Sequence, residues 1–192
     1  MGRIPKRITE LAVMPLLLLL CLMLPVQADA ATVASGNCSD TLTWVLEDNA
    51  TLTISGEGPM KDYTGTAQQP WSSYQDQIRS VVVEDTVTHL GAYAFAEYEN
   101  LECVTIGSGV KTLGNYAFYH CRKLNELNYN AAYVADLDWH NHVLTEAGYD
   151  GEGISLTIGS DVQQIPDQLC YPNSDIDRPK ITRISFQENS SC

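Results

Sequence analysis

The chain contains two consecutive segments with nearly the same sequence. The first, "LGAYAFAEYENLECVTI", spans Leu90–Ile106, and the second, "LGNYAFYHCRKLNELNY", spans Leu113–Tyr129. Matched residues are 23 positions apart throughout: Val87 and Val110, Leu90 and Leu113, Gly91 and Gly114, Tyr93 and Tyr116, Ala94 and Ala117, Phe95 and Phe118, Leu101 and Leu124. A fixed period of this length is typical of repeat architectures. It limits the possible folds more than any other feature of the sequence.

Each repeat includes a short segment in which apolar and polar residues alternate. The pattern recurs in "IRSVVV", "LECVTI", "LNELNY", "ISLTI" and "ITRISF". Equivalent apolar positions, separated by 23, 23, 29 and 28 residues, are Val81, Val104, Leu127, Leu156 and Ile184. Alternation rich in Val, Ile and Thr predicts strands with one buried face. One such unit cannot bury its apolar side alone, so we expect a solenoid of about five rungs over residues 78–192, with an incomplete C-terminal end.

The segments between the strands predict a second apolar layer. Gly91 and Gly114 align with Pro166, whose ring fixes φ near −65°, so a positive φ is not required there. Pro is favoured at the first position of a helix, so we expect a short helical turn to begin here. Phe95 and Phe118 would then stack in the second layer. Leu169-Cys170 takes the place of the Ala-Phe pair in a later repeat, so Cys170 is expected to be a small buried residue.

The residues before the repeats predict a different unit. "LTWVL" and "TLTIS" alternate on either side of "EDNA", which predicts a β-hairpin with Asp/Asn turn chemistry. The ends of a solenoid need capping, so residues 31–77 are expected to form an N-terminal β-hairpin cap. "PWSSYQDQ" is expected to form a short helical turn, with Trp71 starting the internal stack of rings.

These motifs together resemble the BspA-type leucine-rich-repeat proteins of bacterial cell surfaces. The resemblance rests on "LTWVLEDNATLTISGEGPMKDY", "IRSVVVED" and the two "LG-Y-AF" units, and it covers most of residues 36–192. It implies an α/β repeat fold, a right-handed leucine-rich-repeat solenoid with parallel strands on one wall and short helical turns or loops on the other. It also implies export, adhesion or protein binding, no catalysis and no cofactor. The sequence departs from the pattern at Tyr98, which stands where Cys121 stands one repeat later, and in the longer segment 131–153.

The first thirty residues have the features of a secretory signal peptide. A basic start precedes the apolar run "LAVMPLLLLLCLMLP", and "ADA" at 28–30 supplies small residues for cleavage. Cleavage after Ala30 would change the net charge from −13 to −14, because it removes three basic and two acidic residues. A chain this acidic is a poor partner for nucleic acid or anionic membranes. No later stretch predicts a membrane span, so we expect a secreted or cell-surface protein.

The remaining cysteines do not form a metal or redox motif. Their number after cleavage is odd, and no Cys-x-x-Cys pair is present among Cys38, Cys103, Cys121, Cys170 and Cys192. Export permits disulfides, but the spacing indicates no particular pairing. The strand pattern predicts that Cys103 points outward and that Cys121 lies in the opposite layer, so these two thiols should not be bonded.

The outward strand positions form the candidate binding surface for an unknown protein or host surface ligand. Such faces are where repeat solenoids usually bind partners. The candidate residues are Val82, Glu84, Cys103, Thr105, Glu126, Asn128, Asn130, Thr157, Arg183 and Ser185. No Trp, Tyr or Phe is among them, although aromatic anchors dominate interface energetics. An alternative function is therefore a structural spacer or display stalk within a larger surface protein. Tyr98 and Tyr119 are alternative contacts that fit packing equally well.

A remote alternative is a metal-dependent hydrolase. The segment "DLDWHNH" brings Asp136, Asp138, His140 and His142 close together in sequence. A catalytic metal needs ligands that converge on one point with an open position. A polar loop in a stretched repeat explains the segment better, so no metal site is predicted.

The last predicted strand lacks a following apolar layer. "ITRISF" is followed only by "QENSSC". Ile184 and Phe186 would then lack neighbours, and exposed edges of this kind promote association. The sequence therefore predicts a fragment of a longer surface protein, or a last strand that frays or pairs with a second copy.

Overall fold

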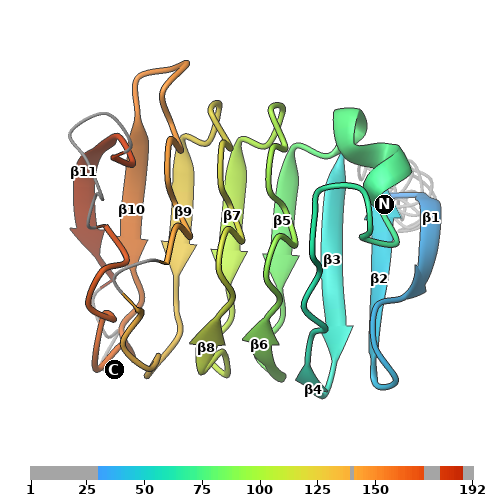
Figure 1. The fold of residues 1–192 in the computed structure, drawn as a ribbon, viewed down its shortest axis with the longest axis horizontal. Helices are drawn as coiled ribbons and strands as arrows, with labels where there is room; N and C mark the ends of the chain where they lie inside the picture. Colours follow the sequence, from blue (N-terminus) through green and yellow to red (C-terminus); the bar gives the residue numbers. More distant parts are fainter. Residues whose placement is uncertain (1–29, 139–140, 171–177, 188–192) are drawn as a thin grey trace, which may run out of the picture. The chain divides into compact units, whose positions relative to one another are not determined.

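The computed structural model describes residues 30–138, 141–170 and 178–187. These residues form two β-sheets and one short helix (Figure 1). The larger sheet has eight strands in the order β1-β2-β3-β5-β7-β9-β10-β11. They are β1 (Thr32–Asn37), β2 (Leu42–Glu47), β3 (Thr51–Gly56), β5 (Ser80–Val83), β7 (Cys103–Ile106), β9 (Glu126–Tyr129), β10 (Ile154–Ile158) and β11 (Ile181–Phe186). The smaller sheet has the order β4-β6-β8, formed by β4 (Gly58–Pro59), β6 (Val87–Leu90) and β8 (Thr112–Leu113).

The parallel register of the repeat strands confirms the predicted alignment. Val81 pairs with Val104, Val104 with Leu127, Leu127 with Leu156, and Leu156 with Ile184. The steps of 29 and 28 residues therefore keep the same register as the steps of 23, because the extra residues lie in the connections. The residues that the structure describes are therefore rich in strands and contain one short helix.

The N-terminal strands extend the same sheet. β2 and β3 form the predicted antiparallel hairpin, and β3 then pairs in parallel with β5, with Ile54 opposite Val83. β1 was not predicted; it pairs antiparallel with β2. Its sequence, "TVASGN", has weak alternation, and its position depends on pairing with β2. Ser72–Gln77 forms a 3₁₀ helix, in agreement with the predicted helical turn.

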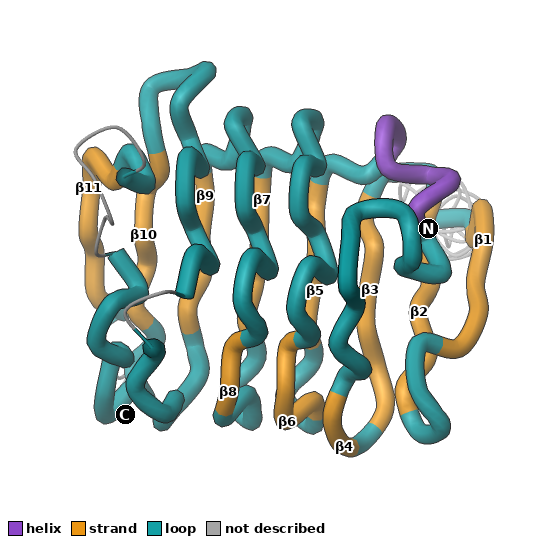
Figure 2. Tube along the Cα trace, viewed as in Figure 1, coloured by secondary structure: helices purple, strands orange, loops and turns teal. Residues whose placement is uncertain are grey.

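The segments that connect the strands lie over the large sheet and close the apolar core (Figure 2). In the two 23-residue repeats these segments are turns, not helices. Tyr93 N–H donates to Asn115 O at 3.0 Å, Phe95 N–H to Ala117 O at 2.9 Å, and Glu97 N–H to Tyr119 O at 2.7 Å. Tyr93 and Glu97, on either side of Phe95, have positive φ angles of 55° and 63°. In this conformation the N–H groups of alternate residues form hydrogen bonds to the next repeat.

The two repeat glycines serve a close approach of backbones. Neither Gly91 nor Gly114 has a positive φ, in agreement with the alignment to Pro166. The expected helical turn at these positions is wrong. A Cβ at Gly91 would lie 2.1 Å from Lys61 O, and a Cβ at Gly114 would lie 2.2 Å from Ala92 N. Glycine is required at both positions because the backbone of the preceding segment, in the cap for Gly91 and in a repeat for Gly114, leaves no room for a side chain.

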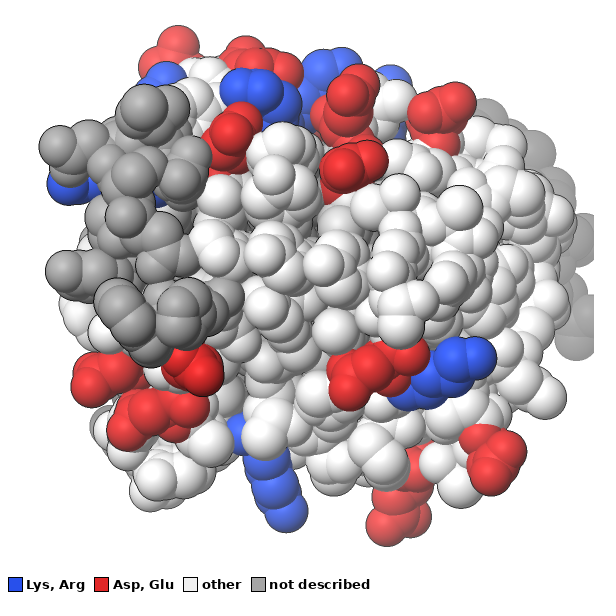
Figure 3. Space-filling model, viewed as in Figure 1, with Lys and Arg blue, Asp and Glu red and all other residues white. Residues whose placement is uncertain are grey.

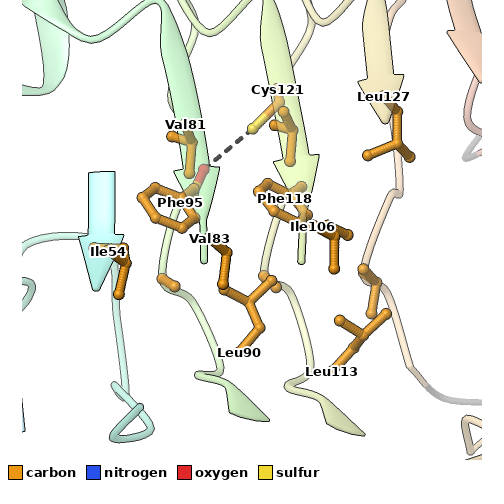
Figure 4. Packing of buried hydrophobic residues seen from close by; sticks show 14 of the residues in the cluster. Ile54, Val81, Val83, Leu90, Phe95, Ile106, Leu113, Phe118, Cys121 and Leu127 are labelled. Atoms are coloured by element: carbon orange, nitrogen blue, oxygen red, sulfur yellow. Dashed lines mark hydrogen bonds between the residues drawn. The ribbon is translucent and has the colours of Figure 1, made fainter. Parts of the chain in front are cut away.

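A stack of aromatic rings runs through the core, as predicted. Trp71 and Phe95 stack at 5.4 Å, and Phe95 and Phe118 stack at 5.6 Å with an interplanar angle of 10°. The two phenylalanines project toward the strand residues, among them Val81 and Ile106 (Figure 4). Cys121 is also buried, and its Sγ donates to Phe95 O at 3.1 Å.

Two cysteine predictions have different outcomes. Cys103 is partly exposed and Cys121 is buried, and both thiols are free, as the strand pattern predicted. The expectation that Cys170 is buried is wrong, because this thiol is exposed. Its neighbour Leu169 occupies the buried position instead. The two residues were aligned as a pair, and only the conformation of the turn decides which one faces the core.

Candidate functional site

The outward side chains of the large sheet form one continuous row. The predicted residues Val82, Thr105, Asn128, Thr157 and Ser185 are direct neighbours on successive strands. The row continues in register through Thr53, Val45 and Ser35 on β3, β2 and β1. We call these eight residues the central row. All of its members are small or medium in size, and none carries a charge.

A second row runs beside the central row. It includes the predicted residues Cys103, Glu126 and Arg183, with Ser80 and Ser155 between or beside them. Glu126 is exposed and accepts a hydrogen bond from Asn128 Nδ2 at 2.8 Å, which ties the two rows together. Burial, with the nearby Glu126 carboxylate as a smaller cause, raises the pKa of the Cys103 thiol. Cys103 is therefore a poor nucleophile at neutral pH.

The remaining predicted residues lie where the strands end. Glu84 follows β5 and Asn130 follows β9, and their backbone N–H groups still bond to the preceding strand, to Ile54 O and Ile106 O. The equivalent positions on β7 and β10 are the buried glycines Gly107 and Gly159. A Cβ at Gly159 would lie 2.5 Å from the side-chain oxygen of Asn130. This third row is therefore interrupted, and the central row is the continuous part of the surface.

The aromatic side chains gather on the connecting segments instead. Tyr93 stacks on Tyr116 at 4.8 Å, and Tyr116 stacks on His142 at 4.9 Å. Tyr119 meets the edge of Tyr116 and stacks on His120 at 3.7 Å. All five rings are partly exposed. The sequence did not predict this ladder. The spacing of 23 between Tyr93 and Tyr116 is the signal that would have found part of it, whereas His142 lies in a longer repeat with no constant offset.

Charged groups also lie on the connecting segments. Figure 3 shows the side of the molecule formed by the connecting segments, where an uncharged middle band separates charged upper and lower margins. One charged cluster joins two repeats: Glu146 lies 3.2 Å from His120 Nε2 and 3.0 Å from Arg122. Arg122 also lies 3.5 Å from Asp150. Tyr98, an alternative contact in the sequence, is fully buried and belongs to the core.

The segment considered for a metal does not converge on one point. Asp136 accepts hydrogen bonds from Gln164 Nε2 at 3.0 Å and from Asp167 N–H at 3.2 Å. His142 instead packs on Tyr116, and its Nδ1 lies 3.2 Å from Thr145 Oγ1. His140 lies outside the described residues. Within the described residues, no three His, Cys, Asp or Glu side chains are placed to hold a metal ion together.

The repeat pattern, the parallel register and the stacked core are all typical of a protein built from short repeats. Residues 72–137 match the family model described as a BspA type leucine rich repeat region (6 copies). Residues 72–137 carry BspA-type leucine-rich repeats. This confirms the resemblance drawn from "LG-Y-AF" and the strand motifs, within the matched residues.

Two solved structures resemble the chain with its BspA-type repeats, and both come from bacteria. A leucine-rich repeat protein from Eubacterium ventriosum ATCC 27560 is 26% identical with a TM-score of 0.56, covering 83% of this chain and 45% of that one. A leucine rich cell surface protein from Faecalibacterium prausnitzii A2-165 is 18% identical with a TM-score of 0.37, covering 83% and 44%. The chain therefore spans less than half of either structure. None of the curated proteins matches it.

The structure also bears on a membrane location. In the ranges that the structure describes, no helix has the length and hydropathy needed to cross a bilayer. The predicted signal peptide, residues 1–30, lies almost wholly outside those ranges.

Proposed function

We propose that this chain is a secreted or surface-exposed, non-catalytic module that binds another protein through its large sheet. The central row carries the proposal, because it crosses all eight strands without interruption from Ser35 to Ser185. Its small side chains let a partner approach the sheet closely along its whole width. At the centre of the row, the side chains of Thr105, Asn128 and Thr157 can form directional hydrogen bonds to a partner.

The architecture that we propose for this function is a right-handed solenoid with residues 31–77 as its N-terminal cap and residues 1–30 as a signal peptide. Two observations support the cap. β1 and β2 are antiparallel additions at one end of an otherwise parallel set of strands. Trp44 of β2 packs against Trp71 with ring centroids 6.1 Å apart, which covers the first ring of the core stack. Solenoid ends need such covering to stay soluble.

Binding by the sheet is tested with two matched substitutions. Asn128→Arg places a large cation in the middle of the central row, whereas Asn125→Arg places the same group just before β9. The purified chain and both variants are applied to cultured host epithelial cells and to an array of purified host surface proteins. We expect saturable binding that Asn128→Arg reduces at least about tenfold, a loss of about 1.4 kcal/mol, and that Asn125→Arg leaves unchanged.

Other outcomes point to different functions. Equal binding by both variants would place recognition outside the central row. Absence of saturable binding to any tested surface would favour the structural spacer, in which the repeats hold other domains at a distance.

A further inference from the structure

The outward face of the large sheet carries three carboxylates and a single cation. Side chains alternate along each strand, so the outward positions of β2, β5 and β9 include Glu47, Glu84 and Glu126. Glu84 directly follows β5, and its N–H still bonds to Ile54 O, so the alternation continues to this residue. Among the outward positions of the described strands, Arg183 of β11 is the single Lys or Arg. The face is therefore acidic over β2–β9.

Neighbouring side chains do not neutralise these carboxylates. None of the three belongs to an ion pair within the part of the chain that the structure describes. Glu84 and Glu126 are exposed, and Glu47 is partly exposed. Glu126 Oε1 accepts a hydrogen bond from Asn128 Nδ2 at 2.8 Å, which holds this carboxylate beside the central row. An amide does not cancel the charge, so the carboxylate still attracts a cation from a partner.

Glu84 and Glu126 lie on opposite sides of the central row. Glu84 comes two residues after Val82, and Glu126 comes two residues before Asn128. One strand, β7, separates β5 from β9. With strands about 4.8 Å apart and about 3.3 Å per residue, the Cα atoms of the two residues are about 16 Å apart. This distance exceeds the Debye length at physiological salt, about 8 Å, so each carboxylate attracts a separate cation.

We propose that the protein bound by the large sheet has a basic contact surface, in which an uncharged strip lies on the central row and two Lys or Arg side chains, about 16 Å apart, reach Glu84 and Glu126. The inference rests on the proposed function and adds the charge of the partner. The central row has no charge and no aromatic side chain, so it gives little selectivity by itself. Complementary charges supply selectivity and speed association, because they steer the partner toward the face before contact.

Arg183 determines the orientation of the partner on the sheet. It lies in the same row as Glu126, two strands further along. A cation of the partner beside Arg183 would be repelled, whereas Glu47 on β2 extends the attraction in the other direction. The basic side chains of the partner should therefore face β2–β9 and leave β11 opposite an uncharged or acidic part of its surface.

Charge substitutions on the sheet face test the proposal. The parent chain and its variants are passed over the immobilised array of purified host surface proteins, at about 20 mM and about 300 mM NaCl, which changes the Debye length from about 20 Å to about 6 Å. At the lower salt, the double variant Glu84→Gln with Glu126→Gln should associate at least about tenfold more slowly than the parent chain. Most of this difference should disappear at the higher salt. Arg183→Gln should speed association.

Glu99→Gln is the matched control. It removes the same charge from an exposed residue of a connecting segment, so it should change the association rate less than about twofold. All substituted side chains are exposed, so the urea midpoints of the variants should equal that of the parent chain.

The outcomes separate this inference from the proposed function. If Asn128→Arg abolishes binding and the double variant binds like the parent chain at both salt concentrations, the sheet binds a partner but the inference is overturned. If Glu99→Gln slows association as much as the double variant does, net charge alone matters and the inference is also overturned. If no protein on the array binds the parent chain, the proposed function and the inference fall together.

Discussion

The rings of Phe95 and Phe118 lie parallel in the core, 5.6 Å apart and completely buried. They occupy equivalent positions of two repeats, 23 residues apart. The 23-residue period therefore also determines the packing of the core, because each ring packs on its counterpart in the next repeat. Trp71 begins the stack at 5.4 Å from Phe95.

Truncating either ring should strongly destabilise the fold. Phe95→Ala and Phe118→Ala each leave a cavity in the stack, so we expect a loss of about 3–5 kcal/mol in the free energy of unfolding. Thr105→Ala changes a residue of the central row and should cost less than about 1 kcal/mol. Urea denaturation measures all three. Similar midpoints for the three variants would contradict the assigned register.

Adding one methyl group at Gly114 should also be costly. The new Cβ would lie 2.2 Å from Ala92 N and 2.6 Å from Ala92 Cα, which are backbone atoms that cannot move aside easily. We expect Gly114→Ala to destabilise by about 1–3 kcal/mol or more. Gly65→Ala is the matched control, because a Cβ there meets no atom within 4 Å. Its effect should stay within about 0.5 kcal/mol.

The cysteines should react with alkylating reagents in a fixed order. Burial raises the pKa of the Cys170 thiol to about 11 although part of the residue is exposed. Cys103 and Cys170 are accessible and Cys121 is buried, so labelling without denaturant should reach both Cys103 and Cys170 before Cys121. Burial, and to a smaller extent the Glu126 carboxylate, raises the pKa of Cys103. Glu126→Gln should therefore lower that pKa and speed the labelling of Cys103 at a fixed pH. Mass spectrometry of labelled peptides gives the rates; early labelling of Cys121 would contradict the assigned core.

Acid should weaken the fold through Asp62. Its pKa lies below the ordinary value of 3.8, first because Ala92 N–H donates to its carboxylate at 2.7 Å and further because His89 Nε2 lies 3.0 Å away. Since the folded pKa is the lower one, the carboxylate stabilises the fold fully above the unfolded value. This stabilisation is lost as the pH falls through the folded value.

Asp62→Asn isolates this contribution. The variant should lose less stability than the parent chain when urea midpoints measured at about pH 6 and about pH 3 are compared. Glu57→Gln serves as the control. If Asp62→Asn and Glu57→Gln show the same pH dependence as the parent chain, the Ala92 and His89 contacts do not stabilise the carboxylate.

The sequence alone determined the repeat, the strand register and the positions that face the core. These follow from local periodicity: a strand turns its side chains alternately to two faces, and a constant offset makes each repeat bury the same residues. The stack of Phe95 and Phe118 and the outward direction of Thr105 and Asn128 follow from the same rule.

Only the tertiary structure decided the features that depend on contacts between repeats. Gly114 is required by a backbone from the preceding repeat, and the exposure of Cys170 depends on the conformation of one turn. His142 joins the Tyr93–Tyr116 ladder across a repeat of different length. β1 forms as a strand because it pairs with the edge of β2. A sequence encodes which residues alternate, but the distance between two chain segments is fixed only when both are packed in the same fold.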